Sequence, residues 1–272
     1  MVVEVAEALH WFSDQWIFWG YWPEVFALAV SSARVLGDPV WVATHLNYQA
    51  WALIVCEHRP AEGFNLALQA REAAENAGDL TQQAWAHYYL AWALQVQDDH
   101  DTAIVHNQRA AHLFAAAGDL HGTLQTMCGH AIHLKSVGHT GAAVRQIRDA
   151  LDFLDRHADA VEDHIARFAR RSLHVVAGDV YVGLGDWQEA VEHLETAVAL
   201  SRDSGNIAME GSALIQLGRA LLSAGSTTEA GAAYARCLHL GSDVDPRVAA
   251  EARDRLADLD RLPPTVSGRR SH

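Results

Sequence analysis

Apolar residues recur along this chain at helical spacing, in runs that each end at a glycine followed by aspartate or asparagine. These dipeptides are Gly37-Asp38, Gly78-Asp79, Gly118-Asp119 and Gly205-Asn206, spaced 41, 40 and 87 residues apart, so that the last interval holds about two periods. Glycine is common just after a helix, because it adopts the left-handed conformation without strain. The pattern therefore predicts α-helices arranged in a repeat of about 40 residues.

Small residues mark equivalent positions in successive repeats. When residues 86–119 are set beside residues 173–206, the small pairs are Ala91 with Gly178, Ala103 with Ala190, and Ala110 with Ala197. The same positions hold Ala131, Ala143 and Ala150 in the next copy, and Gly218, Ala230 and Cys237 in the last. A small side chain there allows the two helices of a repeat to pack closely. The sequence thus predicts stacked two-helix hairpins.

These small positions, together with the segment 184–190 (LGDWQEA), resemble the tetratricopeptide-repeat (TPR) superfamily. The resemblance covers nearly the whole chain. It implies an all-α fold, a right-handed α-solenoid of about five to six helical hairpins with a C-terminal capping helix. We expect one solenoid domain over residues 1–262, followed by a disordered tail. Its expected parts are a divergent N-terminal hairpin, five repeats, a capping helix and the tail, at residues 1–38, 39–241, 246–262 and 263–272.

The first full repeat departs from the pattern. Counted in the same register, Trp51 falls where a small residue is expected, and Gly63 stands where alanine is usual. A tryptophan at that contact would hold the two helices apart, so we expect this hairpin to be splayed or repacked. The period near 40 also exceeds the 34 residues of the standard motif, so we expect longer helices or longer connections.

A narrower resemblance rests on the repeats that end in Ala77-Gly78-Asp79 and Ala117-Gly118-Asp119, and on the tryptophan-rich opening at residues 8–22. These features resemble the C-terminal TPR sensor regions of actinobacterial STAND-type and antibiotic-regulatory transcriptional regulators. The resemblance implies a regulatory module that senses a ligand or a partner. The chain contains no GxxxxGKS/T motif, so it does not carry the phosphate-binding loop of such an ATPase.

Aromatic residues share one face of the helix predicted around residue 90. Trp85, Tyr88, Tyr89 and Trp92 are spaced i, i+3, i+4 and i+7. The TPR resemblance implies that this face lines the concave surface, where it would be joined by His45, Tyr48, Gln125, Cys128, Ile132, Asp179 and Arg219. An apolar groove with a few polar groups suits a peptide, a partner helix or a small apolar effector. The alternative is that these aromatic side chains belong to the core.

Further tryptophans cluster near the N-terminus, at Trp11, Trp16, Trp19 and Trp22. A single neighbouring helix is not expected to cover all four, because their positions around a helix diverge. They form either a capping cluster or a docking surface for another domain or a second subunit, which leaves a homodimer open.

The composition limits the classes of partner that this protein is expected to bind. Lys and Arg number 20 against 34 Asp and Glu, and the resulting net charge of −14 disfavours direct nucleic-acid binding. The chain has no uninterrupted run of 18 apolar residues, so we expect no membrane-spanning helix. The N-terminus does not resemble a signal peptide, so we expect a cytoplasmic location. The three scattered cysteines are expected to stay reduced.

No catalytic or cofactor motif stands out. Cys128, His130 and His133 form the densest group of metal-ligand types, but the helical spacing turns Cys128 away from His130, so we expect no metal and no cofactor. One alternative is an enzyme on a TPR scaffold, with an acid–base pair in the concave groove drawn from His45, Asp179 or His174. The sequence favours a protein-interaction or ligand-sensing module, regulatory in role, over an enzyme.

Overall fold

The computed structural model describes residues 1–15 and 21–261, and the side chains of all of these except residues 11–15. Every regular element in these ranges is helical, which confirms the all-α prediction. None of the described helices is both long and apolar enough to cross a membrane. The elements are α1 (Val2–Gln15), α2 (Trp22–Leu36), α3 (Pro39–Val55), α4 (Pro60–Ala77), α5 (Leu80–Val96), α6 (His100–Ala117), α7 (Leu120–Ser136), α8 (Thr140–Arg156), α9 (Asp163–Leu184), α10 (Trp187–Asp203), α11 (Ile207–Ser223), α12 (Thr227–His239), the 3-10 turn η1 (Gly241–Asp243) and α13 (Pro246–Asp260).

Glycine–aspartate pairs separate successive hairpins. Gly78 ends α4 in the left-handed conformation, with a φ of 69°. Asp79 then caps α5, because its Oδ1 accepts a hydrogen bond from Gln82 N at 2.8 Å. Gly118 and Asp119 repeat the arrangement between α6 and α7. Each pair stops one hairpin and starts the next, so the predicted helix-ending role of these glycines is confirmed.

Small residues let the two helices of a hairpin touch. A Cβ added at Gly178 on α9 would lie 2.4 Å from Leu194 Cγ on α10. A Cβ at Gly218 on α11 would lie 2.3 Å from Tyr234 Cε1 on α12. Leu194 and Tyr234 are both fully buried and have no room to withdraw. Close packing at these positions, which the sequence predicted, is confirmed.

The prediction of a splayed first full repeat is wrong. The connection between α3 and α4 is one residue longer than that between α5 and α6, and this shifts the register of α3 by one position. Ala50, not Trp51, therefore occupies the small position, and it is fully buried. A Cβ at Gly63 on α4 would meet Ala50 O at 2.9 Å and Ile54 Cγ1 at 2.5 Å, so the hairpin is tightly closed. Trp51 points instead to the inner side of the array.

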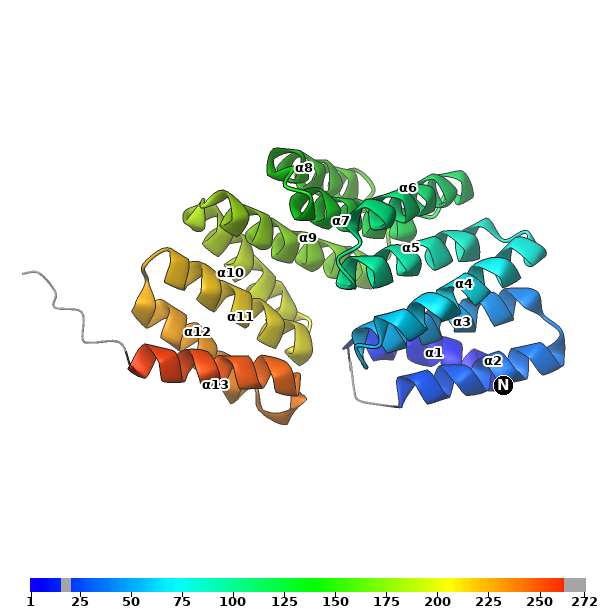
Figure 1. The fold of residues 1–272 in the computed structure, drawn as a ribbon, viewed down its shortest axis with the longest axis horizontal. Helices are drawn as coiled ribbons and strands as arrows, with labels where there is room; N and C mark the ends of the chain where they lie inside the picture. Colours follow the sequence, from blue (N-terminus) through cyan, green and yellow to red (C-terminus); the bar gives the residue numbers. More distant parts are fainter. Residues whose placement is uncertain (16–20, 262–272) are drawn as a thin grey trace, which may run out of the picture.

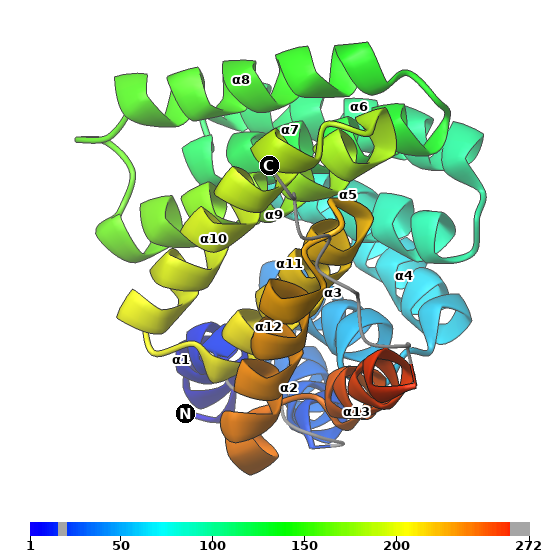
Figure 2. The ribbon, with the colours of Figure 1, turned by 90° about the vertical axis from the view of Figure 1, so that its left-hand side faces the viewer.

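The hairpins stack into an arch (Figure 1). Helices α3, α5, α7, α9 and α11 contact one another in succession. Seen along the arch, α3, α9 and α11 lie towards the middle, while α4, α8 and α10 lie towards the outside (Figure 2). Helices α3, α5, α7, α9 and α11 therefore form the inner, concave layer of a TPR-like solenoid.

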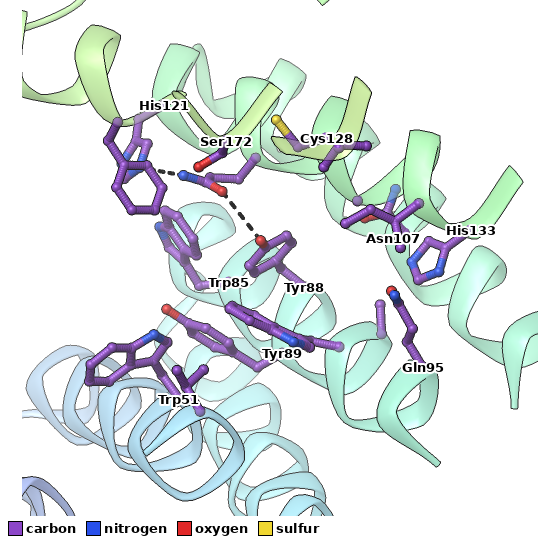
Figure 3. Close-up of a pocket in the computed structure, with 18 of the residues that line it drawn as sticks. Trp51, Trp85, Tyr88, Tyr89, Gln95, Asn107, His121, Cys128, His133 and Ser172 are labelled. Atoms are coloured by element: carbon purple, nitrogen blue, oxygen red, sulfur yellow. Dashed lines mark hydrogen bonds between the residues drawn. The ribbon is translucent and has the colours of Figure 1, made fainter. Parts of the chain in front are cut away.

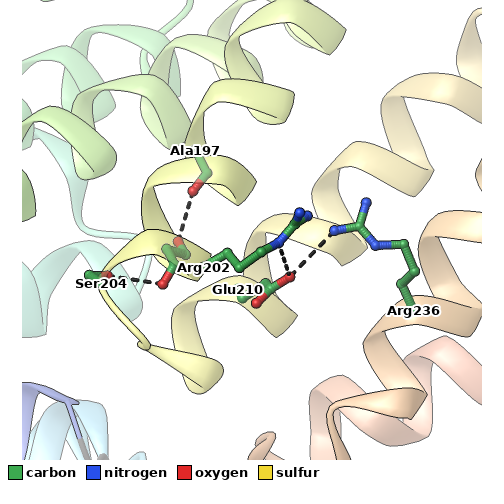
Figure 4. Close-up of polar contacts among 6 residues, drawn as sticks. Ala197, Arg202, Ser204, Glu210 and Arg236 are labelled. Carbon is green, nitrogen blue, oxygen red and sulfur yellow. Dashed lines mark hydrogen bonds and ion pairs between the residues drawn. The ribbon is translucent and has the colours of Figure 1, made fainter.

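Buried charge joins the C-terminal hairpins. Glu210 of α11 is almost fully buried, and its Oε1 lies 3.5 Å from Arg202 Nε of α10 and 3.4 Å from Arg236 Nη2 of α12 (Figure 4). Two positive partners compensate the desolvation of this carboxylate. At the end of the array, Arg219 of α11 pairs with Glu251 of α13 at 2.5 Å. These contacts join the four helices α10, α11, α12 and α13 into one unit.

Both helices of the N-terminal hairpin pack against α3, and α1 adds polar and ring contacts. The ring of His10 stacks on Tyr48 of α3, with centroids 3.7 Å apart. The Tyr48 hydroxyl donates a hydrogen bond to Glu7 Oε1 at 3.0 Å. Helix α1 therefore covers the part of α3 that carries Tyr48.

Only part of the predicted N-terminal tryptophan cluster can be placed. Trp22 is half-buried, and its ring lies 6.1 Å from that of Phe26 within α2. The side chains of Trp11, Trp16 and Trp19 lie outside the described residues, as does the predicted C-terminal tail.

Histidine pairs occupy equivalent places in two hairpins. The Nδ1 atoms of His87 on α5 and His106 on α6 lie 2.9 Å apart, as do those of His174 on α9 and His193 on α10. One nitrogen must donate and the other accept, so each pair needs at least one neutral ring. Burial lowers the pKa of all four rings, which favours this state. In the hairpin of α3 and α4, a leucine pair fills the same positions.

The close approach of α9 and α10 can be tested with two glycines on one helix. Gly178→Ala should lower the free energy of unfolding by about 1–3 kcal/mol, because the new methyl group overlaps Leu194. Gly183→Ala, the control, should raise it by about 0.5–1 kcal/mol through helix propensity. The nearest atom to a Cβ at Gly183 is Lys135 Cε, at 3.9 Å. Urea unfolding measures the free energy of unfolding of both variants. If the two substitutions changed it in the same direction, the tight contact at Gly178 would be contradicted.

Candidate functional site

A cavity of about 350 Å³ lies on the inner side of the arch. Helices α3, α5, α7 and α9 supply most of its wall, and α1, α6 and α11 add one residue each. Its size falls in the range of small-molecule sites in proteins. The cavity therefore forms where the inner helices of several hairpins converge.

Aromatic side chains from two helices form one wall of the cavity. They are Trp51 of α3 and Trp85, Tyr88, Tyr89 and Trp92 of α5 (Figure 3). The ring of Tyr88 makes an edge contact with Trp85 at 5.6 Å and another with Trp92 at 5.9 Å. Their mutual contacts fix the rings in place, so the wall is a preformed surface rather than a set of independent side chains.

A chain of hydrogen bonds crosses from this wall to α7. The Tyr88 hydroxyl donates to Gln125 Oε1 at 3.3 Å, and Gln125 Nε2 lies 3.3 Å from His121 Nε2 (Figure 3). Because an amide NH₂ can only donate, His121 Nε2 accepts this bond and the ring is neutral. The chain holds three polar side chains in a fixed order on this side of the cavity.

A second polar group lies at the other end of the cavity. Gln95, Asn107 and His133 gather there, away from His121 (Figure 3). Asn107 and His133 are each 1% exposed. Within the described part of the chain, Asn107 Oδ1 and His133 Nδ1 have no hydrogen-bond partner. The cavity thus has an aromatic wall and two distinct polar ends.

The described lining of the cavity carries no formal charge at neutral pH. It contains no Asp, Glu, Lys or Arg. Burial lowers the pKa of His10 to about 3 and those of His121 and His133 to about 4. Burial also raises the pKa of the Cys128 thiol to about 12, which favours the neutral thiol over the thiolate at neutral pH.

Seven of the residues selected from the sequence line this cavity together. They are Trp85, Tyr88, Tyr89, Trp92, Gln125, Cys128 and Ile132. The helical spacing of the aromatic group and the repeat register between α5 and α7 both led to this set.

Four selected residues lie elsewhere. His45 is fully buried and stacks on Trp41, because the register of α3 differs by one residue from the register assumed for it. Tyr48 lies beneath α1. Asp179 is exposed and pairs with Lys135 at 2.5 Å, and Arg219 pairs with a residue of α13. None of the four lines the cavity.

Sequence reasoning missed several lining residues. Trp51 would follow from Trp92 once the 41-residue offset is applied to α3. Phe168, Ser172 and Val175 follow one another on α9 at spacings of four and three, a helical-face signal that could have been read. Asn107 comes from the outer helix α6, and no sequence pattern marks it.

The acid–base pair considered for an enzyme is not assembled in this cavity. His45 is buried on Trp41, Asp179 is held by Lys135, and His174 is bonded to His193 across its hairpin. Among the described residues, no three His, Cys, Asp or Glu side chains gather to hold a metal ion. The chemistry that the lining offers is stacking, apolar contact and hydrogen bonding.

Comparisons with known proteins agree with the TPR-like fold. The tetratricopeptide-repeat family model matches residues 173–208. Among curated proteins, none matches the sequence at a significant level. The chain is similar in structure to TTC0263, a thermophilic TPR protein of Thermus thermophilus, with a TM-score of 0.56 and 21% identity over 83% of this chain and 99% of that one.

Two larger proteins also share the fold. The apo form of the quorum sensor NprR from B. thuringiensis has a TM-score of 0.63 and 14% identity, over 84% of this chain and 62% of that one. A Rap protein complexed with competence and sporulation factor has a TM-score of 0.64 and 17% identity, over 82% of this chain and 57% of that one. This chain therefore spans about three fifths of either protein, and it shares their TPR-like α-solenoid fold.

Acid should weaken the fold through the cavity histidines. The pKa of His133 in the folded protein, about 4, lies below its unfolded value near 6.5, so the unfolded chain binds more protons between these pH values. Stability is therefore lost as pH falls from about 6.5 towards 4, by roughly 1 kcal/mol at pH 5.5 for one such ring. Urea unfolding from pH 7 to 4.5 should show this. The slope should be smaller for His133→Leu, and an unchanged slope would contradict a neutral, buried His133.

Proposed function

We propose that this chain is a ligand-sensing TPR module whose inner cavity binds a small, uncharged organic effector. The observation that carries the proposal is a cavity of about 350 Å³ with a preformed aromatic wall and no charged side chain in its described lining. Ligand sites in proteins share this character, being concave, mostly apolar and provided with a few placed polar groups.

The aromatic wall is more than the core of its hairpin. On α5, the most deeply buried packing against neighbouring helices comes from Leu90, Ala91 and Ala93, each at most 1% exposed. Trp85, Tyr88 and Trp92, in contrast, keep part of their surface accessible from the cavity. Large rings that the fold leaves partly open are available to a ligand.

The dimensions favour a small molecule over a peptide helix. An α-helix with side chains is about 10–12 Å across, and a cavity of about 350 Å³ holds only a fraction of one. A free peptide also brings charged termini, which would lose water in this uncharged lining without gaining an ion pair. A single aromatic side chain of a protein partner would fit, and the experiment below separates that case.

A regulatory role fits the way in which the cavity is built. A repeat in a solenoid contacts only its neighbours, so the curvature of the array depends on many small interfaces. Trp51 of α3 and Met209 of α11 line the same cavity although three inner helices separate them in the array. A ligand there would add contacts between distant hairpins and hold one curvature, which a partner domain could recognise.

The comparisons and the sequence support this role without specifying the ligand. One structural neighbour is a quorum sensor, and another was solved in complex with competence and sporulation factor. The sequence resembles the sensor regions of STAND-type regulators. We therefore place the module in a regulatory system in which occupancy of the cavity is the signal.

Binding can be measured with prodan, an uncharged naphthalene dye whose emission shifts to shorter wavelength in apolar surroundings. We expect saturable binding with one site per chain and quenching of tryptophan emission. Trp92→Ala with Tyr88→Ala should weaken binding at least about tenfold, because it removes two anchors of the wall. Trp187→Ala serves as the control, since this half-buried tryptophan begins α10 and does not line the cavity.

Circular dichroism should show that each variant keeps its helices. Equal affinity in the double variant and the wild-type protein would place the dye elsewhere and overturn the proposal. If the wild-type protein does not bind the dye, the proposal of a small-molecule ligand is contradicted. A protein partner that inserts an aromatic side chain into the cavity would then be favoured.

A further inference from the structure

We infer that the cavity selects flat, electrically neutral ligands that carry an N–H or O–H donor at one edge, and that Asn107 Oδ1 accepts a hydrogen bond from this donor. The inference rests on the proposed function and adds the chemical class of the ligand. Its evidence is the polar end formed by Gln95, Asn107 and His133.

Asn107 presents a fixed acceptor. Its Nδ2 donates a hydrogen bond to Thr126 O of α7 at 2.9 Å. Because a backbone carbonyl can only accept, this bond decides which end of the amide is nitrogen, and Oδ1 is left as the free end. Oδ1 is buried and has no hydrogen-bond partner among the described residues. Buried acceptors without partners are uncommon in folded proteins, so a ligand donor is a fitting complement.

The chain leaves room for this acceptor at Gly129. A Cβ at this position would lie 2.8 Å from Asn107 Oδ1, closer than the carbonyl oxygen could tolerate, and 3.8 Å from Tyr88 Cε2. Gly129 sits inside α7, where glycine weakens a helix. The glycine therefore keeps the space between Asn107 and the aromatic wall open at a cost in helix stability.

His133 supplies a second, adaptable group. It lies at the same end of the cavity as Asn107 (Figure 3), and its buried Nδ1 meets no hydrogen-bond partner in the part of the chain that the structure describes. A neutral imidazole nitrogen donates or accepts according to its tautomer. A ligand edge with one donor, or with a donor beside an acceptor, can therefore satisfy both residues.

The opposite end competes less for the same ligand group. There, Tyr88, Gln125 and His121 already bond to one another, and the hydroxyl of Ser172 is a further polar group of the lining (Figure 3). The donor of a ligand thus gains most at the end of Asn107, and the ligand binds in one orientation. The aromatic wall between the two ends favours a flat body that stacks on the rings.

Carbazole and fluorene form a matched pair of probes for this inference. Both are flat, uncharged three-ring molecules of nearly the same shape, and only carbazole carries a ring N–H. Equilibrium dialysis of each against the full chain should give carbazole an affinity about fivefold to tenfold higher, the advantage of one net hydrogen bond. Fluorene-9-carboxylate, an anion at pH 7, should bind at least about tenfold more weakly than fluorene.

Asn107→Leu should abolish the preference, bringing the two affinities within about twofold, while fluorene still binds. Gln108→Leu is the matched control, because this neighbouring amide on α6 is exposed and does not line the cavity. Gly129→Ala is a second route should Asn107→Leu fold poorly, since its methyl group would displace Oδ1. It should reduce the preference without altering the amide itself.

The outcomes separate the two proposals. If neither carbazole nor fluorene binds the wild-type protein, the proposed function fails. If both bind with equal affinity, the cavity takes flat neutral molecules but Asn107 accepts no hydrogen bond from them. The inference is then wrong, while the proposed function stands. A preference that persists in both Asn107→Leu and Gly129→Ala would also overturn the role of Asn107.

Discussion

The two helices of each hairpin approach until a glycine or alanine on one meets a side chain of the other, and the rest of the architecture depends on this contact. Leu194 fits against Gly178, and Tyr234 against Gly218, with no space for a methyl group. Such contacts fix the separation of inner and outer helices, so the hairpins stack at similar angles and form an arch. Some inner-face rings still pack within their own hairpin, as Trp85 does against Phe114 of α6, but part of their surface faces the inner side of the arch.

Burial decides the chemistry of the inner face as much as its residues do. Imidazoles that would titrate near pH 6.5 in water stay neutral here, because burial disfavours the charged form and lowers the pKa of each ring. His121 then accepts from Gln125 and keeps the hydrogen-bond chain intact. The same desolvation keeps Cys128 a thiol. The three histidines and the one cysteine of the described lining therefore offer hydrogen bonds and apolar contact in their neutral forms.

The periodic parts of this structure were accessible from sequence, and the parts that depend on one-residue shifts were not. Glycine–aspartate pairs and small positions predicted the hairpins, and helical spacing predicted the aromatic face of α5. The extra residue between α3 and α4 moved Trp51 into the cavity and His45 out of it, and no periodicity reveals where such a residue is inserted. Asn107 was missed because it reaches the cavity from an outer helix, past a glycine on α7, and contacts between helices are not periodic.

The contrast in side-chain size between α5 and the helices that follow it explains why the cavity lies where it does. Equivalent inner positions hold Trp85, Gln125 and Ser172 on α5, α7 and α9, and another series runs from Tyr89 through Gly129 to Val176. Large rings on α5 therefore face small side chains across the curve of the arch. Uniformly large residues would fill this space and uniformly small ones would leave it open to water, whereas large rings facing smaller side chains leave a walled space. The cavity is consequently a property of several repeats together, and a change of side-chain size at a lining position would reshape it.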